Sequence, residues 1–304
     1  MNDIILVDKP FGYSSFQVVA FLKGLLGIKK IGHGGTLDPL AVGMLPICLG
    51  ESRKFSSYLL DADKHYTVTA NLGLITTTGD LEGEILKQNS SSNITKEEVE
   101  IAMNNLLGDI AQIPPMYSAL KHMGKPLYEY ARAGKTVERK ARQVTIYKFK
   151  LLEWQPPLLK CEVQCSKGTY IRTLLDMLGS NLGIEGASLT DLRRDWVAPF
   201  VNDPVITLEE ITYYYEKNKF MQQPGLVAID KLFYSKSRYD LEEHDARSLA
   251  YGQKVIVADT KNLSSQIALF VDNVFFGLAS LEVSGAINVI KLRQSMVQDL
   301  CSLS

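Results

Sequence analysis

The chain has 304 residues, of which 46% are hydrophobic, 22% charged and 9% aromatic, with a formal net charge of −1. This composition is typical of a globular protein and excludes disorder, collagen and a coiled coil as its main architecture. The length predicts two domains. Neither a membrane-spanning helix nor a signal peptide is expected, because no apolar run of roughly 18 residues occurs and the start lacks a basic segment followed by an apolar one. Four cysteines are too few for a disulfide framework, which favours a reducing cytoplasm.

Charge is distributed unevenly along the chain. Residues 121–150 hold nine Lys or Arg residues and two acidic residues, a net charge of +7, whereas residues 76–120 hold two Lys residues and seven acidic ones. A basic segment of this kind suits contact with a polyanion, but it is also typical of a solvated surface. The charge pattern alone therefore leaves a nucleic-acid partner open.

The first 50 residues are expected to form a strand, a helix and a loop. The apolar run Ile4–Val7 ends at Asp8-Lys9-Pro10 and predicts a buried strand. Ser14 opens a capping-box sequence before an amphipathic pattern, and Gly27 is the expected end of the resulting helix. Residues 31–50 are rich in glycine and contain two prolines, which predicts an ordered loop.

The middle of the chain contains further predicted strands and helices. Thr95 begins a second capping box, and the helix that follows is expected to end at Gly108. Pro156-Pro157 separates two alternating segments and predicts a hairpin, and another helix is expected after Gly168. Three segments alternate apolar with polar side chains, which predicts strands: residues 65–72, 143–154 and 158–165.

Beyond about residue 222 the pattern changes to short apolar runs separated by Gly, Asn, Asp and Ser. These runs predict a small β-rich domain of roughly 80 residues. The whole chain is therefore expected to be an α+β protein. The runs are Lys254–Ala258, Ile267–Val271, Phe275–Leu281 and Ala286–Leu292.

Two patterns that could indicate a metal or nucleotide site are better explained by packing and turns. Cys161 and Cys165 lie on one apolar face of a predicted strand, and no histidine or second cysteine pair has ligand spacing. The glycine-rich residues 32–36 lack the Gly-Lys-[Ser/Thr] ending of a phosphate-binding loop. No metal or nucleotide cofactor is therefore expected.

Two charged residues are candidates for chemistry. Asp38 lies between glycines and a proline, in a segment with little other charge, and either a turn or a catalytic site would explain it. Arg172 lies where a predicted strand gives way to a helix, either as a surface residue or as the partner of a loop carboxylate. Spacing alone does not decide between these interpretations.

Taken together, the motifs resemble the bacterial tRNA pseudouridine-55 synthase family over nearly the whole chain. Any one of them would be weak evidence, but the ordered set is highly specific. The motifs are Asp8-Lys9-Pro-x-Gly12-x-Ser14-Ser15, Gly32-His33-x-Gly-Thr-Leu-Asp38-Pro-x-Ala-x-Gly43-x-Leu-Pro, Lys64-x-Tyr66, Ile113-Pro-Pro-Met-Tyr-Ser-Ala-Leu-Lys121, Leu127-Tyr-x-Tyr-Ala-Arg132, Lys167-Gly-Thr-Tyr170-Ile-Arg172 and Leu192-Arg-Arg194.

The resemblance implies a catalytic domain with a mixed, largely antiparallel sheet flanked by helices, followed by a small PUA-like β-barrel. The expected domains are residues 1–222, with an RNA-gripping insertion at about 114–142, and residues 223–304. The implied activity is isomerisation of uridine 55 in the TΨC loop of tRNA to pseudouridine, without a cofactor. A cytoplasmic monomer that acts on the T arm without a guide RNA is expected.

The resemblance also assigns roles to residues of the active site. Asp38 is the implied nucleophile, attacking either C6 of the base or C1′ of the ribose. Arg172 is implied to pair with that aspartate, which would keep it ionised. Tyr66 is implied to stack on the target base and to be a candidate for taking the C5 proton, while Tyr170 and Leu192 are implied to line the uracil pocket.

Further RNA contacts are implied outside that pocket. His33 matches the position that stacks in the space left by the flipped base, where an aromatic ring contributes about 1–3 kcal/mol. Basic residues of the insertion are expected to contact phosphates, which makes binding salt-dependent. These residues are Lys121, Lys125, Arg132, Arg139, Lys140 and Arg142.

Two departures from the family pattern and two alternative functions accompany this interpretation. Thr77 replaces an acidic residue, and Ser188 stands where a histidine is common, but neither touches the implied nucleophile. One alternative is a tRNA-folding protein that needs no chemistry. The other is the catalytic subunit of a guide-RNA particle, against which the insertion at 114–142 argues.

Overall fold

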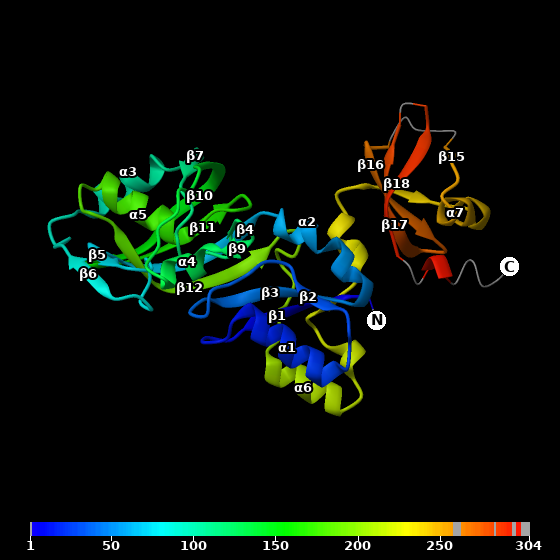
Figure 1. Cartoon of the computed structure of the whole chain (residues 1–304), viewed down its shortest axis with the longest axis horizontal. Helices are drawn as coiled ribbons and strands as arrows, with labels where there is room; N and C mark the ends of the chain where they lie inside the picture. Colours follow the sequence, from blue (N-terminus) through cyan, green and yellow to red (C-terminus); the bar gives the residue numbers. More distant parts are fainter. Residues whose placement is uncertain (1, 258–262, 283, 294–295, 299–304) are drawn as a thin grey trace.

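The computed structural model of the chain describes residues 2–257, 263–282, 284–293 and 296–298. It contains a large sheet and, beside it, a smaller sheet formed by the C-terminal part of the chain (Figure 1). No helix in these ranges is long and apolar enough to cross a membrane.

The larger sheet of the described chain has nine strands and is mixed but largely antiparallel, as predicted. The exception is the parallel pairing of β3 with β12. β2 (Ile31–His33) pairs with β3 beside the main path. The order along the sheet is β13 (Leu226–Val227), β1 (Ile4–Lys9), β3 (Val42–Leu49), β12 (Ala187–Val197), β4 (Lys64–Leu72), β11 (Leu158–Cys165), β10 (Arg142–Gln155) and β7 (Gly108–Gln112).

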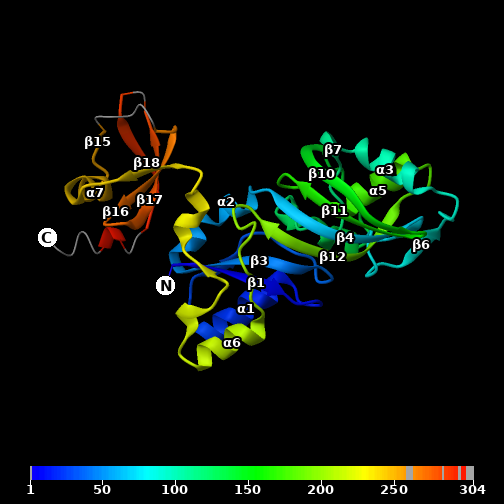
Figure 2. The ribbon, with the colours of Figure 1, turned by 180° about the vertical axis from the view of Figure 1, so that it is seen from behind.

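Helices flank this sheet at both ends (Figures 1 and 2). α1 (Ser15–Leu26) and α6 (Leu208–Glu216) lie side by side near β1 and β3. α3 (Lys96–Asn104) and α5 (Ile171–Asn181) lie near β10 and β11. Their apolar faces join the sheet in one main core.

Two short hairpins extend from the framework. One is formed by β5 (Leu74–Thr76) and β6 (Ile85–Gln88). The other is formed by β8 (Lys121–His122) and β9 (Lys125–Pro126), and α4 (Leu127–Arg132) follows it. The second hairpin and α4 lie within the predicted insertion at 114–142.

The helix caps predicted from sequence are largely confirmed. Ser14 and Thr95 each make both hydrogen bonds of a capping box, at the starts of α1 and α3. Gly27 ends α1 in the left-handed conformation, with φ of 66°. The end of α3 was predicted wrongly: the helix stops at Asn104, because the glycine expected to end it begins β7 instead.

The prediction of a loop over residues 31–50 is wrong for most of its length. β2 and β3 occupy this segment, and β3 is buried because it lies between β1 and β12. Gly43 has a φ of +99°, and a Cβ there would lie 2.3 Å from the carbonyl oxygen of Arg194, so the close strand pairing requires glycine. Only residues 34–41 form the loop that carries Asp38.

The smaller sheet is curled and has five strands within the described residues, consistent with the implied PUA-like barrel. β16, β17 and β18 confirm three of the predicted apolar runs. The fourth run, Lys254–Ala258, contains β15, and its last residue, Ala258, lies outside the described residues. Helix α7 (Glu243–Ala250) was not predicted. The strand order is β14 (Ser237–Asp240), β16 (Gln266–Val271), β17 (Val274–Leu281), β18 (Ala286–Leu292) and β15 (Val255–Ile256).

An aromatic cluster joins the two sheets. Phe55 lies at the end of η1 (Gly50–Phe55) and is fully buried, with ring centroids 5.5 Å from Phe233 and 5.6 Å from Phe275. Phe233 ends η3 (Ile229–Phe233), in the segment that connects the sheets. We propose residues 1–222 and 223–304 as the two domains. The first strand after that boundary, β13, pairs with β1 of the larger sheet.

Candidate active site

A cavity of about 880 Å³ lies where several separate segments of the chain meet. Its walls come from the loop before β3, the end of α2 (Ser56–Leu60), the start of β4, the insertion, the β11–α5 connection and β12. The structure brings together five of the six residues predicted for catalysis and substrate binding: Asp38, Tyr66, Tyr170, Arg172 and Leu192. His33 is not among the residues that line the cavity.

Asp38 and Arg172 form an ion pair at this cavity. Nη2 of Arg172 lies 2.9 Å from Oδ2 of Asp38. The Arg172 side chain is 8% exposed, whereas the Asp38 side chain is 40% exposed. The arginine is therefore part of the framework, while the carboxylate is held in one orientation and stays accessible from the cavity.

Arg172 is itself held by partners from two other segments. Its Nη1 donates to the carbonyl of Thr78 and its Nη2 to the carbonyl of Tyr117, both at 2.8 Å. A second carboxylate, Asp80, is 3% exposed and places Oδ2 3.4 Å from Nη1. The guanidinium is thus fixed between two carboxylates, and its four contacts need the fork geometry that only arginine provides.

Tyr66 reaches the cavity from β4 and is 8% exposed. Burial raises the pKa of its hydroxyl to about 12, against the lowering effect of a hydrogen bond with Arg194. Arg194 is 1% exposed, and its guanidinium donates to the carbonyls of Met44 and Gly35 at 2.8 Å and 3.1 Å. Tyr66 is therefore a neutral phenol at pH 7, beside a buried cation.

His33 lies at the end of β2, just before the loop that carries Asp38. Its Nδ1 accepts a hydrogen bond of 3.4 Å from the amide of Gly35. Burial, and then the charge of Arg194, lower the pKa of His33 below its ordinary value of 6.5. The ring is therefore neutral at pH 7, which suits stacking.

The predicted basic residues of the insertion differ in their surroundings. Lys121, Lys125, Arg132 and Lys140 are exposed. Arg139 is partly buried and donates from Nη1 to the carbonyl of Pro114 at 2.9 Å. Arg142 is also partly buried, and it lines the cavity.

Three residues of this region were missed by sequence reasoning as functional candidates: Lys9, Asp80 and Arg194. Lys9 is fully buried, and its Nζ donates to the carbonyls of Pro10, Tyr13 and Pro39 at 2.9, 2.5 and 3.2 Å. It therefore ties the β1–α1 connection to the residue that follows Asp38. Lys9 and Arg194 lie within quoted motifs, but only a structure shows the partners of all three residues.

The two departures from the family pattern keep their local structure. Thr77 accepts a hydrogen bond of 3.1 Å from the amide of Glu84, which closes the turn between β5 and β6. Ser188 is fully buried and donates to the carbonyl of Leu74 at 2.9 Å. Both side chains are therefore satisfied without the residues usual at these positions.

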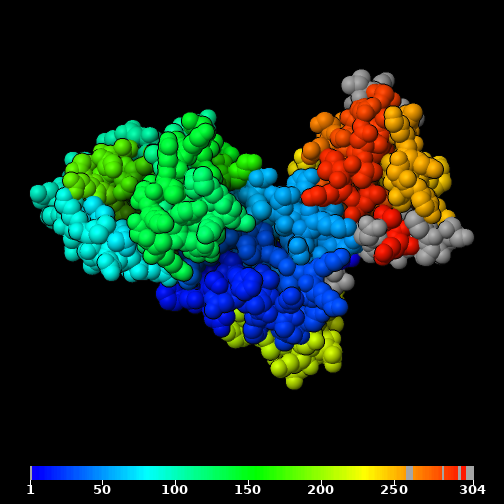
Figure 3. Space-filling view, viewed as in Figure 1, coloured from blue at the N-terminus to red at the C-terminus, as the bar shows by residue number. Residues whose placement is uncertain are grey.

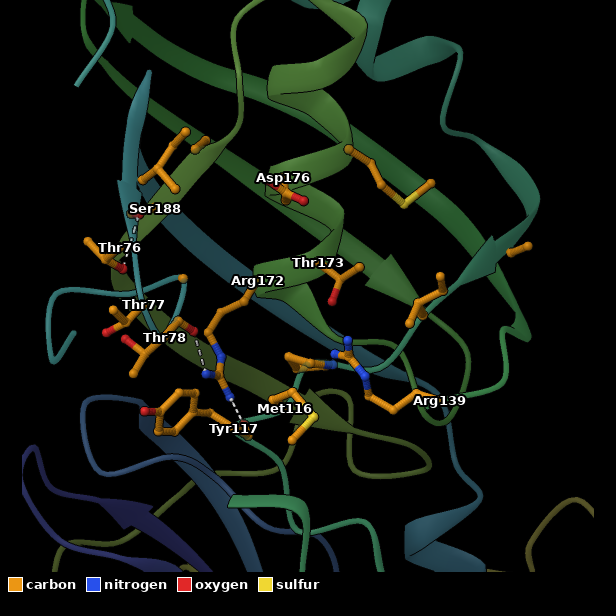
Figure 4. Close-up of a pocket in the computed structure, with 17 residues that line it drawn as sticks. Thr76, Thr77, Thr78, Met116, Tyr117, Arg139, Arg172, Thr173, Asp176 and Ser188 are labelled. Carbon is orange, nitrogen blue, oxygen red and sulfur yellow. Dashed lines mark hydrogen bonds between the residues drawn. The ribbon is translucent and has the colours of Figure 1, made fainter. Parts of the chain in front are cut away.

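A second cavity, of about 570 Å³, also has Arg172 in its wall. Figure 4 shows Arg172 extending from α5 between Thr78 and Tyr117, with dashed lines marking its bonds to their carbonyls. Arg139 lies across the same space in this view. The arginine that orients Asp38 therefore separates the two cavities.

The charged side chains at the cavity can themselves take part in chemistry. Within the described residues, no group of three or more His, Cys, Asp or Glu side chains could hold a metal ion. Cys161 and Cys165 are buried in the main core, as predicted. An oriented carboxylate can act as a nucleophile or base, and a buried guanidinium can stabilise developing negative charge.

Comparisons with known proteins decide the family. Residues 23–171 match the model for the N-terminal domain of TruB family pseudouridylate synthase. The chain is 42% identical over 298 residues to tRNA pseudouridine synthase B of Actinobacillus succinogenes, a match that covers 96% of this chain and 94% of the relative. The chain belongs to the TruB family of pseudouridylate synthases. A second relative, from Haemophilus influenzae, carries the same name and is 44% identical, over 91% of this chain and 89% of its own.

Solved structures support the fold of this TruB-family chain. A Cbf5–Nop10–Gar1 complex contains a chain similar to it with a TM-score of 0.72 and 24% identity, over 95% of this chain and 84% of that one. At this identity the likeness shows the fold only. It confirms the predicted α+β architecture, in which a pseudouridine synthase sheet is followed by a smaller C-terminal sheet.

Proposed function

We propose that this TruB-family enzyme isomerises uridine 55 in the T loop of tRNA to pseudouridine, with Asp38 as the nucleophile. The relatives named tRNA pseudouridine synthase B support the tRNA substrate. The observation that carries the residue assignment is the ion pair of 2.9 Å between Arg172 and Asp38 at the wall of an 880 Å³ cavity. Such a pair holds the carboxylate in one orientation at the space where a base would bind.

The proposed reaction begins with a flipped base. The target uridine leaves its loop at a cost of a few kcal/mol and enters the cavity. Tyr66 stacks on the uracil, Tyr170 and Leu192 enclose it, and His33 stacks in the space that it leaves. This enclosure excludes water while the base is detached.

Bond rearrangement follows within the closed cavity. Asp38 attacks either C6 of the uracil or C1′ of the ribose, and the bond between N1 and C1′ breaks. The base turns, C5 bonds to C1′ and the bond to Asp38 breaks, which restores the carboxylate. C5 loses its proton and N1 gains one, so the product is an isomer of the substrate. Arg172 and Arg194 favour negative charge on the detached uracil. Tyr66 is the proposed acceptor of the C5 proton; it must first lose its own proton, and the adjacent charge of Arg194 favours that phenolate.

The insertion at 114–142 is proposed to hold the T arm through its phosphates. The contacts are assigned to Lys121, Lys125, Arg132, Arg139, Lys140 and Arg142. We further propose a cytoplasmic monomer that needs no guide RNA and no cofactor. Activity of the purified chain on naked RNA, and its mass in solution, test these assignments.

The experiment uses a synthetic T-arm stem–loop and the purified chain without added metal, cofactor or guide RNA. Pseudouridine is detected as a carbodiimide-dependent stop in primer extension. Asp38→Asn keeps the shape of the side chain and removes its charge. Asp191→Asn is the matched control, because Asp191 is exposed on the face of β12 opposite Leu192.

A stop at the target uridine is expected with the unmodified chain and with Asp191→Asn. Asp38→Asn is expected to bind the stem–loop without producing a stop. Normal turnover by Asp38→Asn would refute the nucleophile. Absence of a stop with the unmodified chain, on both the stem–loop and full-length tRNA, would refute the proposed function.

A further inference from the structure

Three large aromatic side chains are exposed in the connection from β1 to α1. Phe11 is 72% exposed, Phe16 is 75% exposed and Tyr13 is 42% exposed. We call these three residues the aromatic lip. They lie within six consecutive residues, so the exposed rings form one local feature rather than scattered surface residues.

Hydrogen bonds anchor the aromatic lip to the loop that carries Asp38. The amide of Gly12 donates to the carbonyl of Pro39 at 2.9 Å, and Lys9 donates to the carbonyls of Pro39 and Tyr13. Ser15 accepts from the amide of Leu37 at 2.8 Å. The backbone of the lip is therefore anchored to Leu37 and Pro39, the residues directly before and after Asp38.

The backbone of the lip is also held on its helical side. Ser14 makes both bonds of the capping box at the start of α1, which fixes the direction in which Phe16 leaves the helix. A ring on a fixed backbone loses little conformational entropy on binding, because only two side-chain torsions must be ordered. The lip is thus prepared for a flat apolar partner.

The charge around the lip favours a polyanion. Apart from the buried Lys9, the chain has three lysines up to Gly50, and Asp38 is the only acidic residue of residues 9–50. Lys23, on α1, is exposed. In the space-filling view, the dark blue surface of the N-terminal residues lies directly below the green surface of the insertion (Figure 3). An RNA that reaches Asp38 past the insertion meets this surface as well.

We propose that the aromatic lip stacks on unpaired nucleobases of the RNA next to the target uridine. The inference rests on the proposed function and adds a contact that reads the flat faces of bases rather than phosphates. Because every base has such a face, the lip would add affinity for RNA and keep the bases beside the target uridine unpaired, without preferring one nucleotide sequence over another. An exposed ring anchored beside the nucleophile is the observation that carries the inference.

The test measures binding of the T-arm stem–loop to the full chain. Phe11→Leu/Phe16→Leu keeps apolar side chains but removes their aromatic faces, and Phe11→Trp/Phe16→Trp enlarges those faces. Ile101→Ala is the matched control, because Ile101 is 60% exposed on α3, a helix that lies at the other end of the large sheet from α1 in Figure 1. Thermal unfolding of each variant checks that these exposed changes leave the fold intact.

The leucine variant is expected to bind about 5- to 150-fold more weakly, the range that loss of one stacked base produces. The slope of log affinity against log salt should stay unchanged, because no phosphate contact is removed. The tryptophan variant should bind at least as tightly as the unmodified chain. 2-Aminopurine placed beside the target uridine should be quenched by the unmodified chain and not by the leucine variant.

Affinity of the leucine variant within twofold of the unmodified chain would overturn the inference and leave the proposed function standing. So would an affinity loss accompanied by a reduced salt slope, since that result assigns the effect to phosphates. Failure of the unmodified chain to bind and modify the RNA would instead refute the proposed function, and the lip would lose its assigned partner.

Discussion

Replacing Lys9 with methionine tests how a buried cation holds the nucleophile loop in place. Lys9 is fully buried and donates to three carbonyls, one of which belongs to Pro39, directly after Asp38. Burial lowers the pKa of Lys9 from 10.5 to about 8. Lys9→Met keeps the length of the side chain but removes both the charge and the donors.

The expected effect on stability follows from these contacts. Each hydrogen bond from a charged donor contributes about 1.5–3 kcal/mol, whereas the lowered pKa of Lys9 represents a burial cost of about 3 kcal/mol. Three such bonds outweigh that cost. At pH 7, the free energy of unfolding of Lys9→Met should therefore be about 1–6 kcal/mol lower than that of the unmodified chain.

The pH dependence provides the sharper signature. Because the pKa is lower in the folded state, the unfolded chain binds more protons between pH 8 and 10.5, and the Lys9 contribution to stability rises with pH there. The burial cost is fully present below pH 8. Relative to pH 6, the unmodified chain should gain about 1 kcal/mol over Lys9→Met at pH 9 and about 3 kcal/mol at pH 10.

Urea unfolding at pH 6, 7, 8, 9 and 10 measures this difference for the two chains. Lys135→Met, at an exposed position of the insertion, controls for the loss of one positive charge. A difference between the unmodified chain and Lys9→Met that stays constant from pH 7 to pH 10 would refute the reasoning. Equal stability at every pH would show that the three carbonyl contacts contribute nothing.

Two further predictions concern RNA binding and the contact between the sheets. Lys121→Ala and Lys125→Ala should each lower the salt slope of stem–loop binding by about 0.7–0.9, and an unchanged slope measured by titration would remove these lysines from the phosphate contacts. Phe55→Ala should lower the free energy of unfolding by about 3–5 kcal/mol, because it removes a ring from the buried aromatic cluster, and should make the segment 223–236 cleavable by limited proteolysis. Unaltered protease resistance would contradict a stabilising role of Phe55.

The sequence predicted elements best where polar side chains mark their ends. Ser14 and Thr95 fixed two helix starts, because a capping box satisfies amides that the helix leaves free. Prediction failed for β3, whose glycine and proline residues imitate a loop although the strand is buried between two neighbours. It also failed for α7, a short helix in which Ala246 and Leu249 are the buried residues.

The site was predicted in its residues but not in its architecture. Spacing left the roles of Asp38 and Arg172 open, and only the resemblance linked these two residues. Their contact depends on the packing of segments more than 100 residues apart, which no local pattern encodes. The inward orientation of Arg194 follows from strand β12, where Leu192 and Arg194 share the buried face, but that strand was not predicted.

The short helix α2 contacts both proposed domains, which limits how the C-terminal domain can be exchanged for that of another protein. Tyr58 packs edge-on against Phe233 near the smaller sheet, while Leu60 lines the cavity two residues later. The carbonyls of Leu59 and Leu60 also hold Lys64 at the start of β4. A chimaera with a different C-terminal domain would therefore have to keep an aromatic surface against which Tyr58 can pack. Without that surface α2 would shift, and the part of the cavity wall that Leu60 forms would change as well.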